Sequence, residues 1–358
     1  MENNQKEYPS YFISWDNFLT NGENSGYYEP EEFQEIIEIY ISENNLDNAR
    51  KTINYAFRQY PEDKEMLYEI LLILNDFELW NDLLDLTIKF EETGEVWGDG
   101  HRLTALLHLG MEEEAFLFFR KLKTKYKDSS EDNIVIYQAM GEALMEVDLF
   151  ESAIDVINEG IALEGEDIDF LWLLLQSYSS VENKEQASAC ADKIQKLNPL
   201  DPESWHRLGV FYAEEEEFEN AIDALENAHS LGYDSPKNLI LLMSVYEQNE
   251  SYNKVLQKAK EYLNLYADNY LVQITAARAC RFIEDWEGSL FYISNAIRVK
   301  PDMDSLYLFQ SASYLELGET LKAIKALESG ILATNDPVGD LKKELDRIND
   351  SYRNDGFK

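Results

Sequence analysis

The chain has few of the residues on which metal sites, disulfide frameworks and membrane spans depend. Its 358 residues include two cysteines, four histidines and eight prolines. No run approaches the ~18–20 consecutive apolar residues that cross a bilayer. The first ten residues, MENNQKEYPS, lack the basic start and apolar run of a signal peptide. These absences predict a cytoplasmic protein without a membrane span.

Basic residues are scarce relative to acidic ones. Thirty-one Lys and Arg stand against 70 Asp and Glu, a formal net charge of −39. Binding to nucleic acid or to an anionic membrane requires clustered cations that neutralise phosphates, so we expect neither. The charge favours solubility and permits, without requiring, a basic protein partner.

Chemical motifs are also missing. His101 and His108 could share one helical face, but no cysteine joins them, and His206 and His229 are isolated. The sequence has no glycine-rich phosphate loop and no nucleophile on a suitable turn. Runs of carboxylates such as Glu214–Glu217 are typical of a solvated turn. We therefore expect no catalytic residues, no metal site and no cofactor.

What the sequence does contain is a 34-residue period. Alternation of apolar and polar residues is too short to indicate a sheet, and the prolines avoid the long helical segments. From residue 134 to about residue 337 the period continues without insertion or deletion, in units that begin at Ile134, Ile168, Pro202, Pro236, Tyr270 and Asp304. A fixed period of this length indicates stacked helix–turn–helix repeats.

The unit 202–235 carries the clearest pattern. One apolar stripe contains Trp205, Leu208 and Tyr212, and a second contains Ala221, Leu225 and Ala228. The polar segment between the stripes turns the chain. Gly209 and Ala221 are small, so we expect the two helices of the unit to approach closely there, and a larger residue to cost roughly 1–3 kcal/mol.

The spacing of Trp205, Leu208–Gly209, Tyr212 and Ala221 closely resembles the tetratricopeptide repeat (TPR) pattern. Other units repeat its tyrosine at Tyr40, Tyr178, Tyr246 and Tyr314, and its alanine at Ala49, Ala115, Ala153, Ala187 and Ala323. Some repeats also end in a proline: Pro61, Pro199 and Pro301. The resemblance implies an all-α, right-handed α-solenoid (superhelix) of about nine TPR-like repeats. Their expected bounds are 30–63, 64–95, 96–133, 134–167, 168–201, 202–235, 236–269, 270–303 and 304–337.

The second and third units depart from this pattern. The second is about two residues short and has Leu83 where a small alanine is expected, whereas the third is about four residues long and opens with the glycine-rich stretch Gly94–Gly100. We interpret 64–133 as a change of curvature or a hinge. Because Cys190 and Cys280 fall in repeats three units apart, we expect two buried, unreactive thiols without a disulfide between them.

Both ends differ from the repeats. Residues 1–29 are rich in aromatic residues, which predicts a segment that caps the first repeat, or alternatively one that occupies the groove of the array. Residues 338–358 place Val338, Leu341, Leu345 and Ile348 on one stripe, which predicts a C-terminal capping helix and tail with a wet outer face.

The resemblance also indicates where a partner would bind. In TPR arrays the first helix of each unit lines the concave side, where ligands commonly lie as extended or helical peptides. The candidate groove residues in this chain are Trp172, Gln176, His206, Val210, Ile240, Arg278, Arg281 and Leu308. An exposed tryptophan is a common interface anchor, although neighbouring side chains could cover Trp172 and Ile240.

Two further surface features bear on the kind of partner. The Lys and Asn carboxylate clamp of chaperone-binding TPR domains is absent, because the corresponding places carry Gln34, Glu38, Tyr68 and Glu142. The basic run Arg120, Lys121, Lys123, Lys125 and Lys127 ends a second helix. It either offsets the helix dipole and pairs with nearby acids or contacts an acidic partner.

Together these features predict a non-catalytic scaffold or adaptor that binds a protein or peptide in the concave groove. The alternative is a regulatory sensor that binds a small ligand or signalling peptide and changes superhelical pitch. A closed apolar pocket in the middle repeats, with Trp172 in its wall, would favour the sensor. The partner's identity and the oligomeric state stay open.

Overall fold

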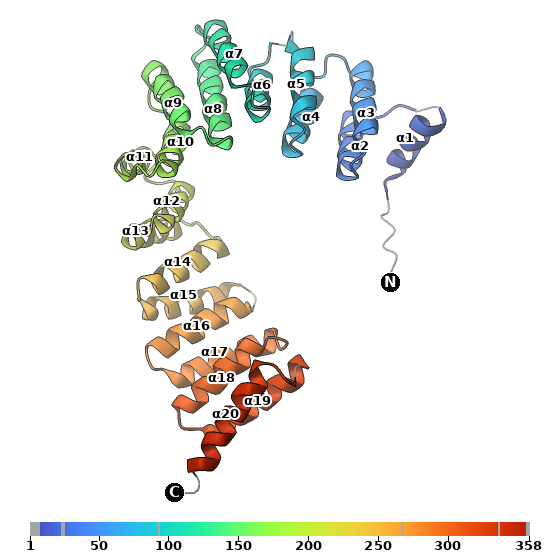
Figure 1. Ribbon diagram of the computed structural model, residues 1–358. Helices are drawn as coiled ribbons and strands as arrows, with labels where there is room; N and C mark the ends of the chain where they lie inside the picture. The colour runs from blue at the N-terminus through green and yellow to red at the C-terminus, as the bar shows by residue number, and fades with distance from the viewer. Residues whose placement is uncertain (1–7, 23–25, 92–93, 267, 336, 356–358) are drawn as a thin grey trace. The chain divides into compact units, whose positions relative to one another are not determined.

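The computed structural model describes residues 8–22, 26–91, 94–266, 268–335 and 337–355, with side chains through Ser351. All the regular structure in these residues is helical, in 20 α-helices, and no strand occurs among them. The chain divides into two compact units, Met1–Ile194 and Gln195–Lys358, and the division falls within α11. Each unit is a stack of helix pairs, which confirms the all-α solenoid predicted from the repeat (Figure 1).

Unit 1 begins with a single helix and continues as pairs. Its helices are α1 (Ser10–Asn21), α2 (Pro30–Ser42), α3 (Leu46–Gln59), α4 (Lys64–Asp76), α5 (Trp80–Lys89), α6 (Val96–His108), α7 (Glu112–Lys125), α8 (Ser130–Glu146), α9 (Phe150–Glu164), α10 (Ile168–Ser180) and α11 (Lys184–Leu197).

Unit 2 contains four pairs and a last single helix. Its helices are α12 (Pro202–Glu214), α13 (Phe218–Ser230), α14 (Pro236–Gln248), α15 (Tyr252–Leu265), α16 (Tyr270–Phe282), α17 (Trp286–Val299), α18 (Asp304–Glu316), α19 (Thr320–Thr334) and α20 (Asp340–Asp355). In both units we call the even-numbered helices α2–α18 first helices and the odd-numbered helices α3–α19 second helices.

The same turn joins the first and second helix of every described pair. One residue in the turn adopts a left-handed conformation: Asn44, Glu78, Gly110, Asp148, Glu182, Glu216, Glu250, Glu284 or Gly318. In the pair α12/α13, the amide of Glu217 donates to the carbonyl of Tyr212 at 2.8 Å and that of Glu216 to Ala213 at 3.3 Å. This Schellman pattern satisfies carbonyls that the end of a helix otherwise leaves unpaired. The left-handed residues are 34 apart, except for 32 between Glu78 and Gly110 and 38 between Gly110 and Asp148.

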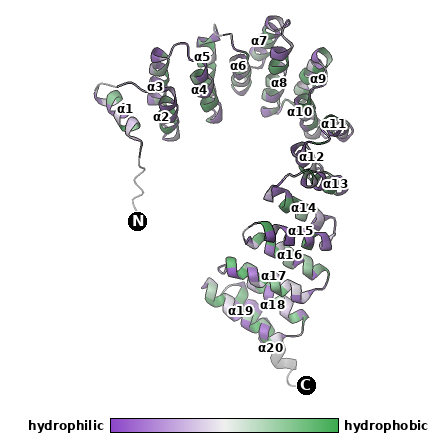
Figure 2. Ribbon diagram, turned by 180° about the vertical axis from the view of Figure 1, so that it is seen from behind, coloured by the Kyte–Doolittle hydropathy of each residue, from purple (hydrophilic) through white to green (hydrophobic). Residues whose placement is uncertain are grey.

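Amphipathic helices build a continuous core in each unit. Figure 2 shows both apolar and polar residues along the helices of both units. The small residues fall where two helices come close. A Cβ atom added to Gly209 would lie 2.5 Å from the Leu225 side chain, and Ala221 is fully buried. The predicted close approach of α12 and α13 at these residues is therefore confirmed.

The third pair explains the glycine-rich stretch of the sequence. Gly98 and Gly100 lie inside α6, and a Cβ atom on Gly100 would be 3.1 Å from the Cβ of Ala139 on α8. As a result α6 packs more extensively against α8 than against its own partner, α7. Helix α8 is correspondingly long, at 17 residues. Whether 64–133 acts as a hinge stays a prediction.

The N-terminal helix α1 covers the first pair. Trp15 is fully buried and donates its indole N–H to the Thr52 hydroxyl at 2.8 Å. Its ring centroid lies 5.4 Å from that of Phe33 on α2 and 5.0 Å from that of Tyr55 on α3. These contacts support the predicted cap, because α1 removes from water the apolar surface that a preceding repeat would otherwise cover. Residues 1–7 and 23–25 of the predicted segment lie outside the described residues.

At the other end, α20 packs against α18 and α19. Leu341, Leu345 and Ile348 join a buried cluster with Tyr307 and Leu327, in agreement with the predicted stripe. Val338 departs from the prediction: it precedes α20 in a turn and is 78% exposed. The stripe therefore begins at Leu341, because only residues within the helix share its apolar face.

Candidate functional site

Six of the eight candidate groove residues lie on first helices of unit 2, where the 34-residue register predicts that they share one side of the stack. We call the side chains of His206, Val210, Ile240, Arg278, Arg281 and Leu308 the first-helix face of unit 2; they come from α12, α14, α16 and α18. Ile240 is 42% exposed, although burial would be expected to stabilise an isoleucine. Its exposure agrees with the prediction that the repeat core does not need it.

Both arginines of this face are held in place. The Arg278 guanidinium donates to the Glu247 carboxylate at 3.0 Å, which links α16 to α14. The Arg281 guanidinium lies 4.8 Å from the ring centroid of Phe309 on α18. A cation over an aromatic face is attracted to the negative centre of the ring, so Arg281 is oriented while remaining half-buried. The face thus combines cations with apolar groups.

The remaining residues of the face are partly covered. The His206 ring stacks on Tyr233 at 4.4 Å, and its Nδ1 lies 2.9 Å from Asn238 Oδ1. Val210 is half-buried. Leu308 packs against the core cluster of α18–α20 and is half-buried. His206 and Leu308 therefore contribute to packing within unit 2 as well as to its surface.

Sequence reasoning missed two exposed apolar residues of α16. Leu271 is 56% exposed, and Phe282 is 61% exposed while it stacks on Tyr252 at 4.4 Å. Trp80 stacks on His108 at 3.9 Å in the corresponding places of α5 and α6. The repeat register could have predicted both stacked ring pairs, because Trp80 and Tyr252 each follow the left-handed turn residue of their helix pair by the same number of residues.

The prediction that Trp172 is an exposed anchor is wrong. Trp172 is only 5% exposed, within an uninterrupted buried run from Phe170 to Leu175 on α10. A helix that is apolar on all sides is buried on all sides, and α10 packs against α8 and α9. Gln176, one turn later, is exposed and remains available for a contact.

The first helices of unit 1 carry a different charge. Glu31, Glu38, Glu65 and Asp76 are exposed on α2 and α4. On α8, desolvation raises the pKa of Glu142, and the nearby carboxylates of Glu146 and Asp169 raise it further. Repulsion among carboxylates marks an electronegative surface that would favour a bound cation. We call this the acidic face of unit 1.

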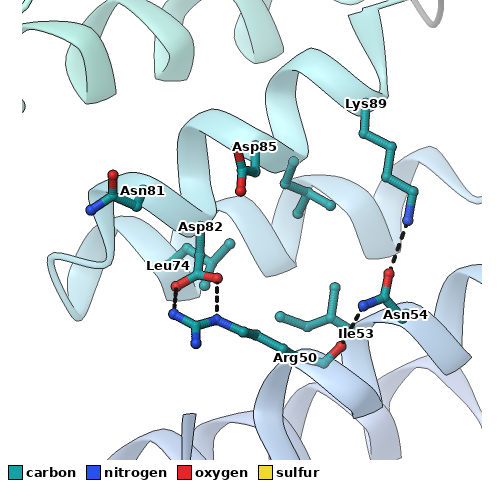
Figure 3. Close-up of a pocket in the computed structure, with 9 residues that line it drawn as sticks. Arg50, Ile53, Asn54, Leu74, Asn81, Asp82, Asp85 and Lys89 are labelled. Carbon is teal, nitrogen blue, oxygen red and sulfur yellow. Dashed lines mark hydrogen bonds and ion pairs between the residues drawn. The ribbon is translucent and has the colours of Figure 1, made fainter. Parts of the chain in front are cut away.

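A cavity of about 320 Å³ lies between the second helices α3 and α5 (Figure 3). Its charged groups largely satisfy one another. Arg50 donates two hydrogen bonds to Asp82, at 2.6 and 2.8 Å, and Lys89 donates to Asn54 at 3.2 Å. The floor is formed by Ile53, Leu74 and Leu86. This arrangement links two neighbouring repeats.

The basic run at the end of α7 pairs with acids, as the first of its two interpretations expected. Lys123 donates to Glu159 at 2.8 Å, and Lys125 contacts the buried carboxylate of Asp99 at 2.6 Å. Burial lowers the pKa of Lys125, but the hydrogen bonds and charges of Asp99 and Tyr126 together outweigh burial and leave the pKa raised. Tyr126 also donates to Asp99, at 2.8 Å. These contacts tie the end of α7 to the start of α6.

Other kinds of site are not found in the described part of the chain. No group of three or more His, Cys, Asp or Glu residues there is arranged to hold a metal ion. None of the helices there is long and apolar enough to cross a membrane. Both thiols are buried and unpaired, as expected, and burial raises the pKa of Cys190 and of Cys280 to about 11.

Comparison with known sequences gives two likenesses. Residues 105–265, less than half of the chain, match the sequence model of the ChAPs family (Chs5p-Arf1p-binding proteins). The TPR repeat-containing protein YvcD of Bacillus subtilis (strain 168) is 25% identical over 237 residues, which cover 63% of this chain. The match spans only 45% of the length of that relative.

Comparison with solved structures agrees with the helical stack. The C-terminal part of a TPR repeat-containing protein from Cytophaga hutchinsonii has a TM-score of 0.53 at 17% identity; the match covers 67% of this chain and 96% of that chain. YrrB, described as a TPR protein with an unusual peptide-binding site, has a TM-score of 0.43 at 18% identity; the match covers 54% of this chain and 99% of that chain. The repeat geometry, the likeness to YvcD and the fold shared with the Cytophaga hutchinsonii structure together identify a TPR-type helical-repeat protein.

Proposed function

We propose that this chain is a non-catalytic scaffold or adaptor that binds a protein or peptide partner on its first-helix faces. The observation that carries the proposal is the exposure of Ile240 on α14 together with the oriented cations Arg278 and Arg281 on the next first helix, α16. An apolar group surrounded by fixed polar groups is the usual composition of a protein interface. The helices are already ordered by repeat packing, so binding would cost little ordering entropy on this side.

The chemistry of each face suggests what it would bind. The first-helix face of unit 2 suits a segment with an apolar side chain next to a carboxylate, because Arg278 and Arg281 supply the opposite charge. The acidic face of unit 1 suits a basic segment, which the strong negative charge of the chain would also steer towards it. The ChAPs family is named for proteins that bind Arf1p, which is consistent with a protein partner for this chain.

The proposal is tested by affinity capture from a lysate of the native host, read by mass spectrometry. The bait variant Ile240→Ser/Arg278→Ala alters the first-helix face of unit 2 without touching a buried residue. Its matched control, Leu321→Ser/Lys254→Ala, removes an exposed aliphatic side chain and a paired cation from the second helices α19 and α15. We expect the first variant to lose the partner and the control to keep it. Retention by both, or loss from the control alone, would refute the proposed face.

Salt dependence separates the two faces. A partner of the acidic face of unit 1 should be released between about 0.1 and 0.5 M salt, because screening weakens exposed charge pairs. A partner anchored by Ile240 should persist over the same range, since apolar burial is not screened. Release by salt in both cases would show that charge alone holds the partner.

The sensor remains the second candidate function. It was expected to have a closed apolar pocket with Trp172 in its wall, whereas Trp172 is packed in the core around α10 and does not line the cavity described between α3 and α5. The scaffold is therefore the better supported candidate.

A further inference from the structure

One register position of the repeat holds an aromatic ring in two of the four pairs of unit 2. In the pair α12/α13 it is Trp205, whose indole N–H donates to the carbonyl of Pro199 at 2.9 Å. In the pair α18/α19 it is Tyr307, whose hydroxyl donates to the carbonyl of Pro301 at 2.9 Å. The equivalent residue of α16 is Gln273, which has no ring. Leu239 of α14 also lacks a ring, but it is apolar and fully packed, so Gln273 is the polar residue at this position among the first helices of unit 2.

The side-chain carbonyl oxygen of Gln273 is an unsatisfied hydrogen-bond acceptor. The residue is only 3% exposed, and its Oε1 atom is buried without a hydrogen-bond partner in the described residues. Most buried acceptors in proteins are paired, and the exceptions often mark a place where a water or a ligand belongs. Gln273 lines a cavity of about 410 Å³ between the second helices α15 and α17. We call this cavity the Gln273 pocket.

The rest of the wall suits a flat ring. Tyr292 is 6% exposed and Phe291 is 63% exposed, so one aromatic residue lies inside the wall and the other at its rim. Leu263 adds an apolar surface, and Asn264 and Asn295 add carboxamides. Aromatic rings attract other rings at their edges or in offset stacks. The pocket thus combines ring contacts with the unpaired Oε1 of Gln273.

The mouth of the pocket carries more positive than negative charge. Lys260 and Arg298 line it from α15 and α17, and Asp268, with which Arg298 forms an ion pair at 2.6 Å, is the one carboxylate among the lining residues. A net positive mouth is unusual on a chain with a net charge of −39. It would attract a small anion, and it disfavours a cation.

We propose that the Gln273 pocket binds a small aromatic acid whose planar ring carries an N–H donor. The ring takes the place that Trp205 and Tyr307 fill in the sister repeats, and its N–H donates to Gln273 Oε1. The acid group faces Lys260 and Arg298. Apart from Gln273 on α16 and Asp268, the lining residues come from the second helices α15 and α17, and no residue of the first-helix face of unit 2 lines the pocket.

The first test is ligand-observed NMR on the full chain with indole-3-propionate as the probe. Two relatives of the probe each change one feature: N-methylindole-3-propionate has no N–H, and tryptamine has the opposite charge. A third, cyclohexanepropionate, lacks both the planar ring and the N–H. We expect the indole acid to bind, the first two relatives to bind about tenfold more weakly because each loses one hydrogen bond or ion pair, and the third to bind more weakly still. Equal binding of all four, or no binding of the indole acid at about 10 mM, would overturn the proposal.

Two variants assign the binding to this pocket. Gln273→Trp restores the ring of the repeat pattern, and it should abolish binding while the melting temperature stays the same or rises. Gln273→Leu keeps most of the space and removes the acceptor, and it should weaken binding about tenfold. Gln257→Leu, at an exposed residue of α15 that does not line the pocket, is the matched control and should bind normally.

Other outcomes contradict the assignment. Unchanged binding by both Gln273 variants would place the ligand elsewhere. If an acidic peptide containing tryptophan binds at this pocket and the free indole acid does not, the site is a docking pocket for a protein anchor and the small-molecule proposal is wrong.

Discussion

Glutamate occupies many of the left-handed turn positions, although glycine adopts this conformation with the least strain. Of the nine turn residues described above, five are glutamate and two are glycine. A residue with a Cβ atom loses roughly 1–2 kcal/mol in this conformation, and a negative charge at the end of a helix opposes the helix dipole. The hydrogen bonds of the Schellman pattern hold the turn despite this cost.

Glu216→Gly should therefore stabilise the chain. We expect the free energy of unfolding to rise by about 1 kcal/mol, because strain and an unfavourable charge are removed together, less the entropy that glycine adds to the unfolded state. Urea denaturation measures the change. The matched control, Glu214→Gly, lies two residues earlier at the last position of α12, where the conformation is right-handed, and should lower stability by up to about 1 kcal/mol. A loss in both variants would contradict the account of the turn.

Gly209→Ala should have the opposite effect. The added methyl group would lie 2.5 Å from the Leu225 side chain, so α12 and α13 must move apart. We expect a loss of about 1–3 kcal/mol in the free energy of unfolding. Gly98→Ala in α6 is the control, since its Cβ atom would meet nothing within 4 Å, and it should gain about 0.5–1 kcal/mol. Equal effects would show that helix propensity, and not contact, decides the result.

His101 gives the chain a pH-dependent stability. Burial lowers its pKa below the usual 6.5, against the opposing effect of Asp76 and Glu146. The unfolded chain then binds a proton at a pH where the folded chain does not, so stability is lost as pH falls below about 6.5 towards the folded-state pKa. His101→Gln should reduce the loss of stability between about pH 7.5 and 5.5, measured by urea denaturation. A loss as steep as that of the unmodified chain would contradict this assignment.

At the scale of elements, contacts about one repeat apart in the sequence connect the helices. Arg50–Asp82, Arg278–Glu247 and Arg298–Asp268 all join neighbouring pairs. A further contact, between Lys125 and Asp99, involves a buried carboxylate: the Asp99 side chain is only 8% exposed. It connects α6 and α7, which pack less extensively against each other than α6 packs against α8.

Asp99→Asn tests this contact. The substitution removes the charge that holds Lys125 and weakens the bond from Tyr126, so we expect a loss of about 1–3 kcal/mol in the free energy of unfolding. Lys127→Met breaks an exposed pair with Asp128 and should change stability by less than about 0.5 kcal/mol. Calorimetric melting of both variants provides the comparison. A similar small change in both variants would mean that the Asp99 contact does not stabilise the packing of α6 and α7.

At the scale of the whole chain, the period predicted the fold because every repeat solves the same packing problem. The small residues Gly209 and Ala221 and the apolar Leu225 indicate this packing in the sequence. The helix pairs and their close approach could therefore be predicted. The exposure of single side chains is harder to predict. The repeat register gives the side of the helix on which a residue lies, but it does not show which neighbouring side chains cover that residue. Ile240 is exposed as expected, whereas Trp172, in the same register, is buried in the apolar helix α10. The buried acceptor of Gln273 was also missed, although its departure from Trp205 in the 34-residue register was a visible signal.

The central claim, that a partner binds the first-helix face of unit 2, is tested most directly by site-specific photo-crosslinking. A photoreactive phenylalanine would replace Ile240 in one chain and Leu321, on the second helix α19, in another; both residues are exposed. The chains would be irradiated in a lysate of the native host, and the adducts identified by mass spectrometry. The account predicts a partner adduct at 240 and none at 321. An adduct at 321 alone, or equal adducts at both residues, would contradict it.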